Sequence, residues 1–253
     1  MVKISVIIPA RMAASRFPGK PLVQIAGLPM IEHVRRRSLL APGVHRVVVA
    51  TCDMEIMDVV ESYGGIAVMT SDRHERCTER VAEAARAFES DVVVNVQGDE
   101  PLMFPESITQ ASSPLMEASG VHCVSLLSPL EGDADLQNPN IVKAVCRPQG
   151  EVLYFSRASV PYFQKPGKAP VFRETGIRAL RSDFLQQYAN LSETELERIE
   201  SIDMMRVLEH GFKILGVPTD YATMGVDHVE DVGTVEKILA GDPVQRGIFE
   251  SIL

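Results

Sequence analysis

Residues 1–22 read MVKISVIIPARMAASRFPGKPL. Within them, Ile4–Ile8 is a short apolar run that ends at a proline, which is typical of a buried parallel strand. Three cations, Arg11, Arg16 and Lys20, follow within ten residues on a loop of small residues, glycine and proline. In α/β sheets, the loop after the first strand is where phosphates bind. The stretch predicts an α/β fold with an anion site here, although a solvated surface loop has a similar composition.

Apolar segments of strand length alternate with segments of helical period, which predicts a mostly parallel Rossmann-like sheet with helices on both faces. Strands are expected at Ile4–Ile8, Arg46–Ala50, Ile66–Met69, Asp91–Val96, Val121–Leu127 and Phe212–Val217. Helices are expected at Met30–Leu40, Asp53–Tyr63 (with Asp53 as N-cap), Glu75–Phe88, Pro105–Ala118, Leu180–Leu191, Glu193–His210 and His228–Leu239. A hairpin is expected where Ile141–Cys146 and Glu151–Phe155 flank Pro148-Gln149-Gly150. We expect one α/β domain over residues 1–253, with a β-rich insertion at about 130–180.

The chain of 253 residues has a formal net charge of -9, which argues against a general nucleic-acid or membrane-surface binder. Its four cysteines form no CxxC pair, so reduced thiols in a cytoplasmic protein are expected, rather than disulfides or metal ligands. The first apolar run is too short for a signal peptide, and no apolar stretch reaches membrane-spanning length. We therefore expect neither nucleic acid nor a membrane as partner.

Two carboxylate motifs indicate a metal site. The buried strand at Asp91–Val96 ends in Gln97-Gly98-Asp99-Glu100-Pro101, and an acid at the end of a central strand is well placed to hold Mg²⁺ together with substrate phosphates. Further along, Gly225-Val226-Asp227 precedes a predicted helix, and Asp227 could share that metal. The alternatives are a polar turn with a helix cap for the first motif and a simple N-cap for Asp227.

A cysteine nucleophile is not expected. Cys77 lies beside Arg76, which could lower the pKa of its thiol, but no partner histidine stands at a diagnostic spacing. The six histidines are scattered without a metal-binding pattern, so surface or core positions are expected for them.

Taken in order, these motifs resemble the sugar-acid cytidylyltransferases of the 3-deoxy-manno-octulosonate (Kdo) type, which activate acidic sugars with CTP for lipopolysaccharide or surface-glycan synthesis. The shared text is IIPAR (7–11), SRFPGKPL (15–22), PMI (29–31), TER (78–80), VNVQGDEP (94–101), NPN (138–140), LYFSRA (153–158), RVL (206–208) and GVD (225–227). The resemblance implies a nucleotide-diphospho-sugar transferase fold and a homodimer that uses the insertion in its interface. It also implies attack of the sugar's anomeric hydroxyl on the α-phosphorus of CTP, with release of pyrophosphate.

The resemblance assigns roles to individual residues. Nucleotide-binding residues would be Ala10, Arg11, Arg16, Lys20, Thr78, Arg80 and Gln97. Acceptor-binding residues would be Gln97, Arg157, Glu174, Arg178 and Asp203. Asp99 and Asp227 would ligate Mg²⁺, and Arg11, Lys20 and Asp99 would be catalytic.

Several positions depart from the family pattern. Cys77 stands where the family has glycine, Asp203-Met204 replaces Glu-Gln, and Glu174 replaces a histidine of the sugar pocket. A carboxylate at 174 should repel an acidic sugar by about 4 kcal/mol at about 4 Å unless Arg173 or Arg178 compensates. The acceptor could therefore be Kdo, or alternatively an amino-substituted acid sugar, another acid sugar or a phosphonate. A non-catalytic nucleotide-binding protein is a further alternative, which the retention of both metal carboxylates disfavours.

Overall fold

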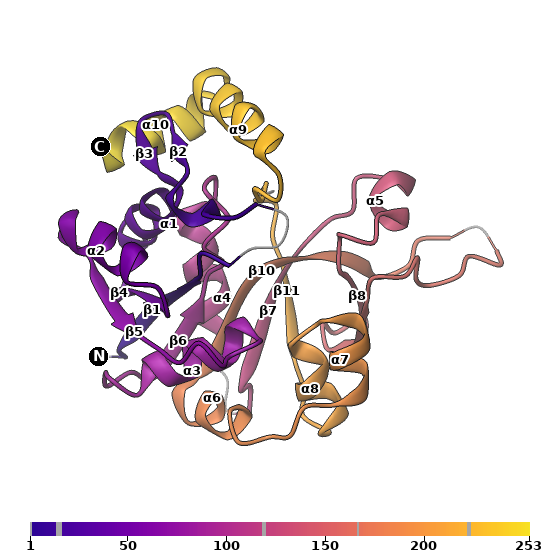
Figure 1. Cartoon of the computed structure of the whole chain (residues 1–253). Helices are drawn as coiled ribbons and strands as arrows, with labels where there is room; N and C mark the ends of the chain where they lie inside the picture. Colours follow the sequence, from indigo (N-terminus) through magenta and orange to yellow (C-terminus); the bar gives the residue numbers. More distant parts are fainter. Residues whose placement is uncertain (1, 14–16, 118–119, 166, 222–223) are drawn as a thin grey trace.

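The computed structural model describes residues 2–13, 17–117, 120–165, 167–221 and 224–253 (Figure 1). Its main sheet has the order β11-β7-β10-β6-β1-β4-β5, with β8 beside β10 and β9 beside β8. Its strands are β1 (Ile4–Ala10), β4 (Val44–Thr51), β5 (Ile66–Met69), β6 (Val92–Asn95), β7 (Cys123–Ser128), β8 (Lys143–Cys146), β9 (Val152–Ser156), β10 (Val171–Arg181) and β11 (Leu215–Pro218). The short strands β2 (Gln24–Ile25) and β3 (Leu28–Pro29) form a separate pair.

Parallel pairing dominates the core of the sheet. Strand β1 lies parallel to β4 and β6, β4 to β5, and β7 to β11. Strand β10 runs antiparallel to β6, β7 and β8. The predicted mostly parallel α/β fold is therefore confirmed. Among the described strands, β10 runs antiparallel between β6 and β7, and β9 pairs antiparallel with β8.

Helices cover both faces of this sheet. They are α1 (Met30–Leu39), α2 (Met54–Ser62), α3 (Cys77–Ala85), α4 (Pro105–Glu117), α5 (Asp133–Gln137), α6 (Ser182–Tyr188), α7 (Glu195–Glu200), α8 (Met204–Glu209), α9 (Val229–Gly241) and α10 (Pro243–Ile252), with a 3-10 turn η1 at Lys20–Leu22. In β1, Val6 and Ile8 pack with α1, α2 and α4, whereas Ile7 packs with α3 and α6. Successive side chains of a strand point to opposite faces, so an unbroken apolar run fits a strand buried on both sides. None of the described helices has the length and apolar character that crossing a membrane requires.

Three sequence-based assignments were wrong in the second half of the chain. The helix expected from Leu180 begins only at Ser182, because Leu180 belongs to β10, a strand that the sequence reasoning missed. The helix expected over Glu193–His210 is two helices, α7 and α8, separated at Ser201, whose φ is +54°. Helix α10 was also missed.

The region at about 130–180 holds α5, the β8–β9 hairpin and the first part of β10. The hairpin was predicted correctly: Lys143 pairs with Ser156, and Gly150, with φ +89°, lies in the turn. Strand β8 also pairs with the start of β10, so the hairpin extends the main sheet on one side. In Figure 1, α5 and the neighbouring loops project away from α1 and α2.

Candidate active site

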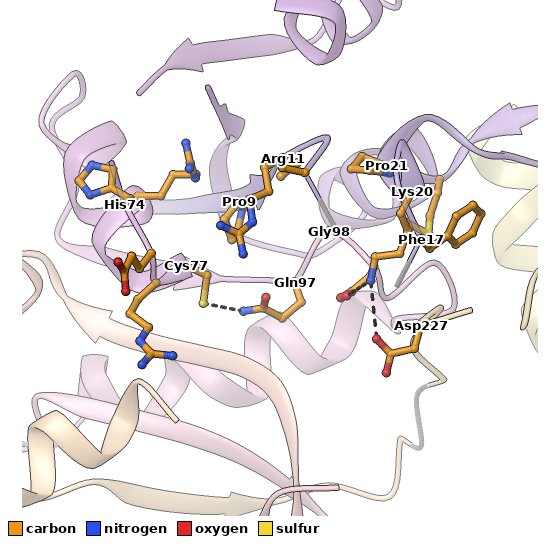
Figure 2. Close-up of a pocket in the computed structure, with 17 residues that line it drawn as sticks. Pro9, Arg11, Phe17, Lys20, Pro21, His74, Cys77, Gln97, Gly98 and Asp227 are labelled. Carbon is orange, nitrogen blue, oxygen red and sulfur yellow. Dashed lines mark hydrogen bonds and ion pairs between the residues drawn. The ribbon is translucent and has the colours of Figure 1, made fainter. Parts of the chain in front are cut away.

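A pocket of about 300 Å³ lies at the carboxyl ends of β1 and β6 (Figure 2). This is the edge at which α/β sheets bind ligands. Its walls come from the loop after β1, the segment at the start of α3, the turn after β6 and one residue before α9. The lining residues with charged or hydrogen-bonding side chains are Arg11, Lys20, His74, Glu75, Arg76, Cys77, Arg80, Gln97, Asp99 and Asp227.

The basic loop, Pro9–Lys20, is folded by its own backbone and by one distant carboxylate. The amide of Gly19, at a φ of +73° that favours glycine, donates to the carbonyl oxygen of Met12 at 3.1 Å. The amide of Met12 donates to Oδ2 of Asp53 at 2.8 Å. Asp53 stands at the N-cap position of α2, as predicted, but its side chain makes no capping bond to that helix. The carboxylate holds the basic loop instead.

The predicted nucleotide-binding residues of this loop are at the pocket. Ala10 ends β1 and Arg11 follows it, and both line the cavity. Lys20 begins η1 and also lines it. Arg16 lies outside the described residues. Their contacts with a nucleotide stay a prediction.

Lys20 joins the two predicted metal carboxylates. Its Nζ lies 2.6 Å from Oδ2 of Asp99 and 3.8 Å from Oδ1 of Asp227, and it donates to the carbonyl oxygen of Val226 at 2.8 Å (Figure 2). The amide of Val226 donates to the carbonyl oxygen of Asp99 at 2.9 Å. The segments that carry Asp99 and Asp227, 128 residues apart, are therefore hydrogen-bonded to each other beside the ammonium group of Lys20.

The capping alternatives for these carboxylates do not hold. The N-cap of α9 is His228, and Asp231 accepts hydrogen bonds from the amides of both Asp227 and His228. Asp227 is left to face Lys20 and the pocket. Asp99 is separated from the start of α4 by several residues and caps no described helix.

The donor set fits Mg²⁺. Mg²⁺ takes hard oxygen ligands and is commonly held by one or two carboxylates, with water and substrate phosphates completing its shell. Asp99 and Asp227 converge on a single point already occupied by the ammonium of Lys20, which shows that the position suits a cation. Among the described residues, no group of three or more His, Cys, Asp or Glu side chains is placed to hold a metal ion, so these two carboxylates are the candidate protein ligands.

Thr78 and Arg80, the predicted base and ribose contacts, differ in placement. Arg80 lines the pocket and donates to Oγ1 of Thr70 at 2.5 Å. Thr78 is fully buried behind the wall, and both its hydroxyl and its amide donate to Oδ2 of Asp203, at 2.8 and 3.2 Å. Asp203 thereby anchors the first turn of α3.

Of the five predicted acceptor residues, Gln97 alone lines the described pocket. Arg157, which belongs to the insertion, donates from Nε to the carbonyl oxygen of Glu200 in α7 at 2.8 Å. Arg178 lies behind the wall, with Nε 2.6 Å from Oε1 of Glu174 and Nη1 3.7 Å from Oδ2 of Asp203. The compensation of Glu174 by Arg178 that the sequence left open is therefore present. Contact of these residues with an acceptor stays a prediction.

The buried charges around Arg178 are balanced. Burial tends to raise the pKa of Asp203, but Arg178 and the hydrogen bonds from Cys77 and Thr78 outweigh it and hold this pKa below its ordinary value. The pKa of Arg178 lies well above its ordinary value because Glu174, Cys77 and Asp203 overcome the effect of burial. Asp203 is thus a carboxylate at neutral pH.

Sequence reasoning missed some residues of the site. His74 and Arg76 line the pocket, although the sequence analysis gave neither residue a role in the site. The tether from Asp53 to Met12 spans 41 residues, and no sequence pattern announces it.

Comparison with known proteins gives a consistent result. The sequence model of the family described as Cytidylyltransferase matches residues 5–214. A 3-deoxy-manno-octulosonate cytidylyltransferase of Geotalea daltonii is 43% identical over 245 residues, which cover 92% of this chain and 97% of that protein. A solved CMP:2-keto-3-deoxy-manno-octonic acid synthetase complexed with CTP superposes with a TM-score of 0.88 and 36% identity, covering 94% of this chain and 98% of that one. A Leptospira borgpetersenii cytidylyltransferase, at 16% identity and a TM-score of 0.67, shares the fold.

Proposed function

The chain belongs to the cytidylyltransferase family that includes the 3-deoxy-manno-octulosonate cytidylyltransferases, and we propose that it transfers CMP from CTP to Kdo. The observation that carries this proposal is the contact of Lys20 with both Asp99 and Asp227 beside the basic loop. This arrangement supplies cations and hard oxygen donors at one point, as a bound triphosphate requires.

In the proposed reaction, the anomeric hydroxyl oxygen of the sugar forms a bond to the α-phosphorus of CTP. The bond from that phosphorus to the bridging oxygen breaks, pyrophosphate leaves, and the hydroxyl proton is lost to solvent. Arg11 and Lys20 bind the phosphate oxygens, and fixed positive charge there stabilises the negative charge that develops during transfer. Asp99 and Asp227 would hold Mg²⁺, which when bound neutralises phosphate charge. The protein supplies positioning and electrostatics rather than a covalent intermediate.

Kdo is favoured over the other acceptors. The reason for an amino-substituted sugar or a phosphonate was an uncompensated carboxylate at Glu174, and that carboxylate pairs with Arg178 at 2.6 Å. The curated relatives that are about 40% identical are Kdo cytidylyltransferases. A non-catalytic role is disfavoured because the basic loop and both carboxylates stand together.

The same proposal places the enzyme in lipopolysaccharide or surface-glycan synthesis, in the cytoplasm and as a homodimer. Free thiols at all four cysteines support a reducing compartment. Exposed apolar side chains in and near the insertion support self-association through that region, with Tyr162 85% and Ile199 64% exposed. Analytical ultracentrifugation tests the dimer.

Turnover with CTP, Mg²⁺ and Kdo tests the function, with pyrophosphate release followed by a coupled assay and the product by ³¹P NMR. CMP-Kdo should form, and Asp99→Asn should abolish it while the protein stays folded. An amino-substituted acid sugar and a phosphonate serve as parallel acceptors. Folded protein that releases no pyrophosphate with Kdo would refute the proposal, and preference for a parallel acceptor would redirect it.

A further inference from the structure

Cys77 stands at the centre of a directed chain of hydrogen bonds. Its Sγ lies 3.0 Å from Oδ2 of Asp203. The same sulfur lies 3.3 Å from Nε2 of Gln97 (Figure 2). Nε2 of Gln97 also donates to Oδ1 of Asn95 at 3.5 Å. Cys77 and Gln97 line the pocket, whereas Asp203 lies behind it.

The direction of each bond follows from Asp203. An ionised carboxylate only accepts hydrogen bonds, so the thiol of Cys77 must donate its single proton to Asp203. The sulfur can then only accept, which requires Gln97 to turn its NH₂ group toward it. Burial and the charge of Asp203 raise the pKa of Cys77 to about 11, so the proton is present at neutral pH.

Packing also restricts where the side chain of Gln97 lies. Gly176 of β10, at φ +79°, lies so close that a Cβ there would stand 2.9 Å from Cγ of Gln97. The amide donates toward Cys77 and Asn95 on the wall side, so its carbonyl oxygen Oε1 is left for the pocket. Gln97 lies two residues before Asp99, and both residues line the pocket.

We propose that Cys77 is a positioning residue that makes Gln97 a pure hydrogen-bond acceptor, so that the site selects a hydroxyl of the acidic sugar near the reacting centre. The proposal rests on the proposed function only for the identity of that ligand. The polarity of Gln97 is a property of the unliganded protein and can be measured without turnover.

The first test is kinetic and uses Cys77→Ala, Cys77→Ser and Gln97→Ala in the full chain. Cys77→Ala should raise KM for Kdo about three- to tenfold, as expected for loss of one oriented hydrogen bond, while KM for CTP stays within twofold. Cys77→Ser, which can donate and accept like the thiol, should restore KM for Kdo. In a Gln97→Ala background, Cys77→Ala should cause no further rise in KM for Kdo. Cys146→Ala, which removes a thiol outside the pocket, is the matched control.

The second test is ¹⁵N NMR of the Gln97 side-chain amide, assigned by its absence in Gln97→Ala. Its protons should exchange slowly with water in the wild type and in Cys77→Ser, and at least tenfold faster in Cys77→Ala. Unchanged exchange, or an effect of Cys77→Ala that persists without Gln97, would overturn the proposal. If the wild type fails to use Kdo but its Gln97 side-chain amide is protected from exchange, the proposed function is refuted, whereas the positioning role of Cys77 is supported.

Discussion

The carboxylate of Asp53 accepts a hydrogen bond from the backbone amide of Met12 at 2.8 Å, which ties the basic loop to the first turn of α2. Strands β1 and β4 are neighbours, so the ends of the two strands bring these residues together. The loop that we expect to bind the triphosphate is thus held in place before any ligand arrives. Such preorganisation lowers the entropic cost of binding.

Replacing Asp53 should weaken CTP binding. Asp53→Ala removes the tether and should raise KM for CTP about fivefold, which corresponds to about 1 kcal/mol for a partly exposed hydrogen bond to a charged group. Asp53→Asn keeps an acceptor oxygen and should cost less. Steady-state kinetics with saturating Kdo measures this. An Asp53→Ala enzyme with unchanged KM for CTP would show that the loop needs no tether.

Lys20 should have two separable roles. Lys20→Met should lower kcat about 100- to 1,000-fold, the usual cost of removing a fixed charge that stabilises a transition state. The same change leaves Asp99 and Asp227 without their shared cation, so Mg²⁺ should raise Tm of the variant more than that of the wild type when CTP is absent. Thermal unfolding over a series of Mg²⁺ concentrations measures the second effect, with Lys3→Met as control. Equal Mg²⁺ responses would argue against a metal site at these carboxylates.

The pair of Glu174 and Arg178 should matter for stability. Both side chains are nearly buried, and Glu174→Ala leaves Arg178 with Asp203 as its remaining close carboxylate. Removing one partner of a buried ion pair typically costs about 3–5 kcal/mol, so Glu174→Ala should lower the free energy of unfolding in urea by an amount of this order. The double variant Glu174→Leu with Arg178→Met should not recover the loss, because it leaves the buried carboxylate of Asp203 without Arg178. A single variant as stable as wild type would contradict the buried pairing.

The pair also shows where sequence reasoning stops. The run Ile4–Ile8 predicted β1 because it is apolar throughout, whereas β10 contains Arg173, Glu174, Thr175 and Arg178 and shows no strand pattern. Arg178 pairs with Glu174 four residues earlier in the same strand and also approaches Asp203 from a distant segment, and no local pattern records the second contact. The sequence named Arg178 as a candidate partner of Glu174, and the fold shows that the two side chains meet.

The residues that line the pocket were easier to predict from the sequence than the residues that hold them in place. Arg11, Lys20, Gln97, Asp99 and Asp227 all line the pocket, because residues at the carboxyl ends of parallel strands meet at one edge. The residues that hold them were invisible, since contacts such as that of Asp53 with Met12 depend on which strands become neighbours. Helix α10 did have a local signal: Asp242 accepts hydrogen bonds from two amides of the first turn, and proline follows it.

His33 should make stability depend on pH. This residue of α1 is fully buried, donates from Nε2 to the carbonyl oxygen of Ile25 at 2.8 Å and stacks on Phe249 of α10. Burial, with smaller contributions from Arg37 and Arg36, lowers its pKa from 6.5 to about 4. Between these two values the unfolded chain binds a proton that the folded protein does not, so the free energy of unfolding must fall as pH falls.

Urea unfolding of the wild type and of His33→Gln at pH 7 and pH 4.5 tests this dependence. Glutamine can still donate to Ile25 but does not titrate, so it keeps the hydrogen bond and removes the proton uptake. With a folded pKa of about 4 and an unfolded pKa of 6.5, His33 should account for about 2 kcal/mol of the loss between the two pH values. Carboxylates such as Asp203 and Glu83, whose pKa values are lowered, also reduce stability at low pH, but they do so equally in both proteins. Parallel losses in wild type and variant would therefore show that His33 titrates normally and that its burial does not control the acid sensitivity.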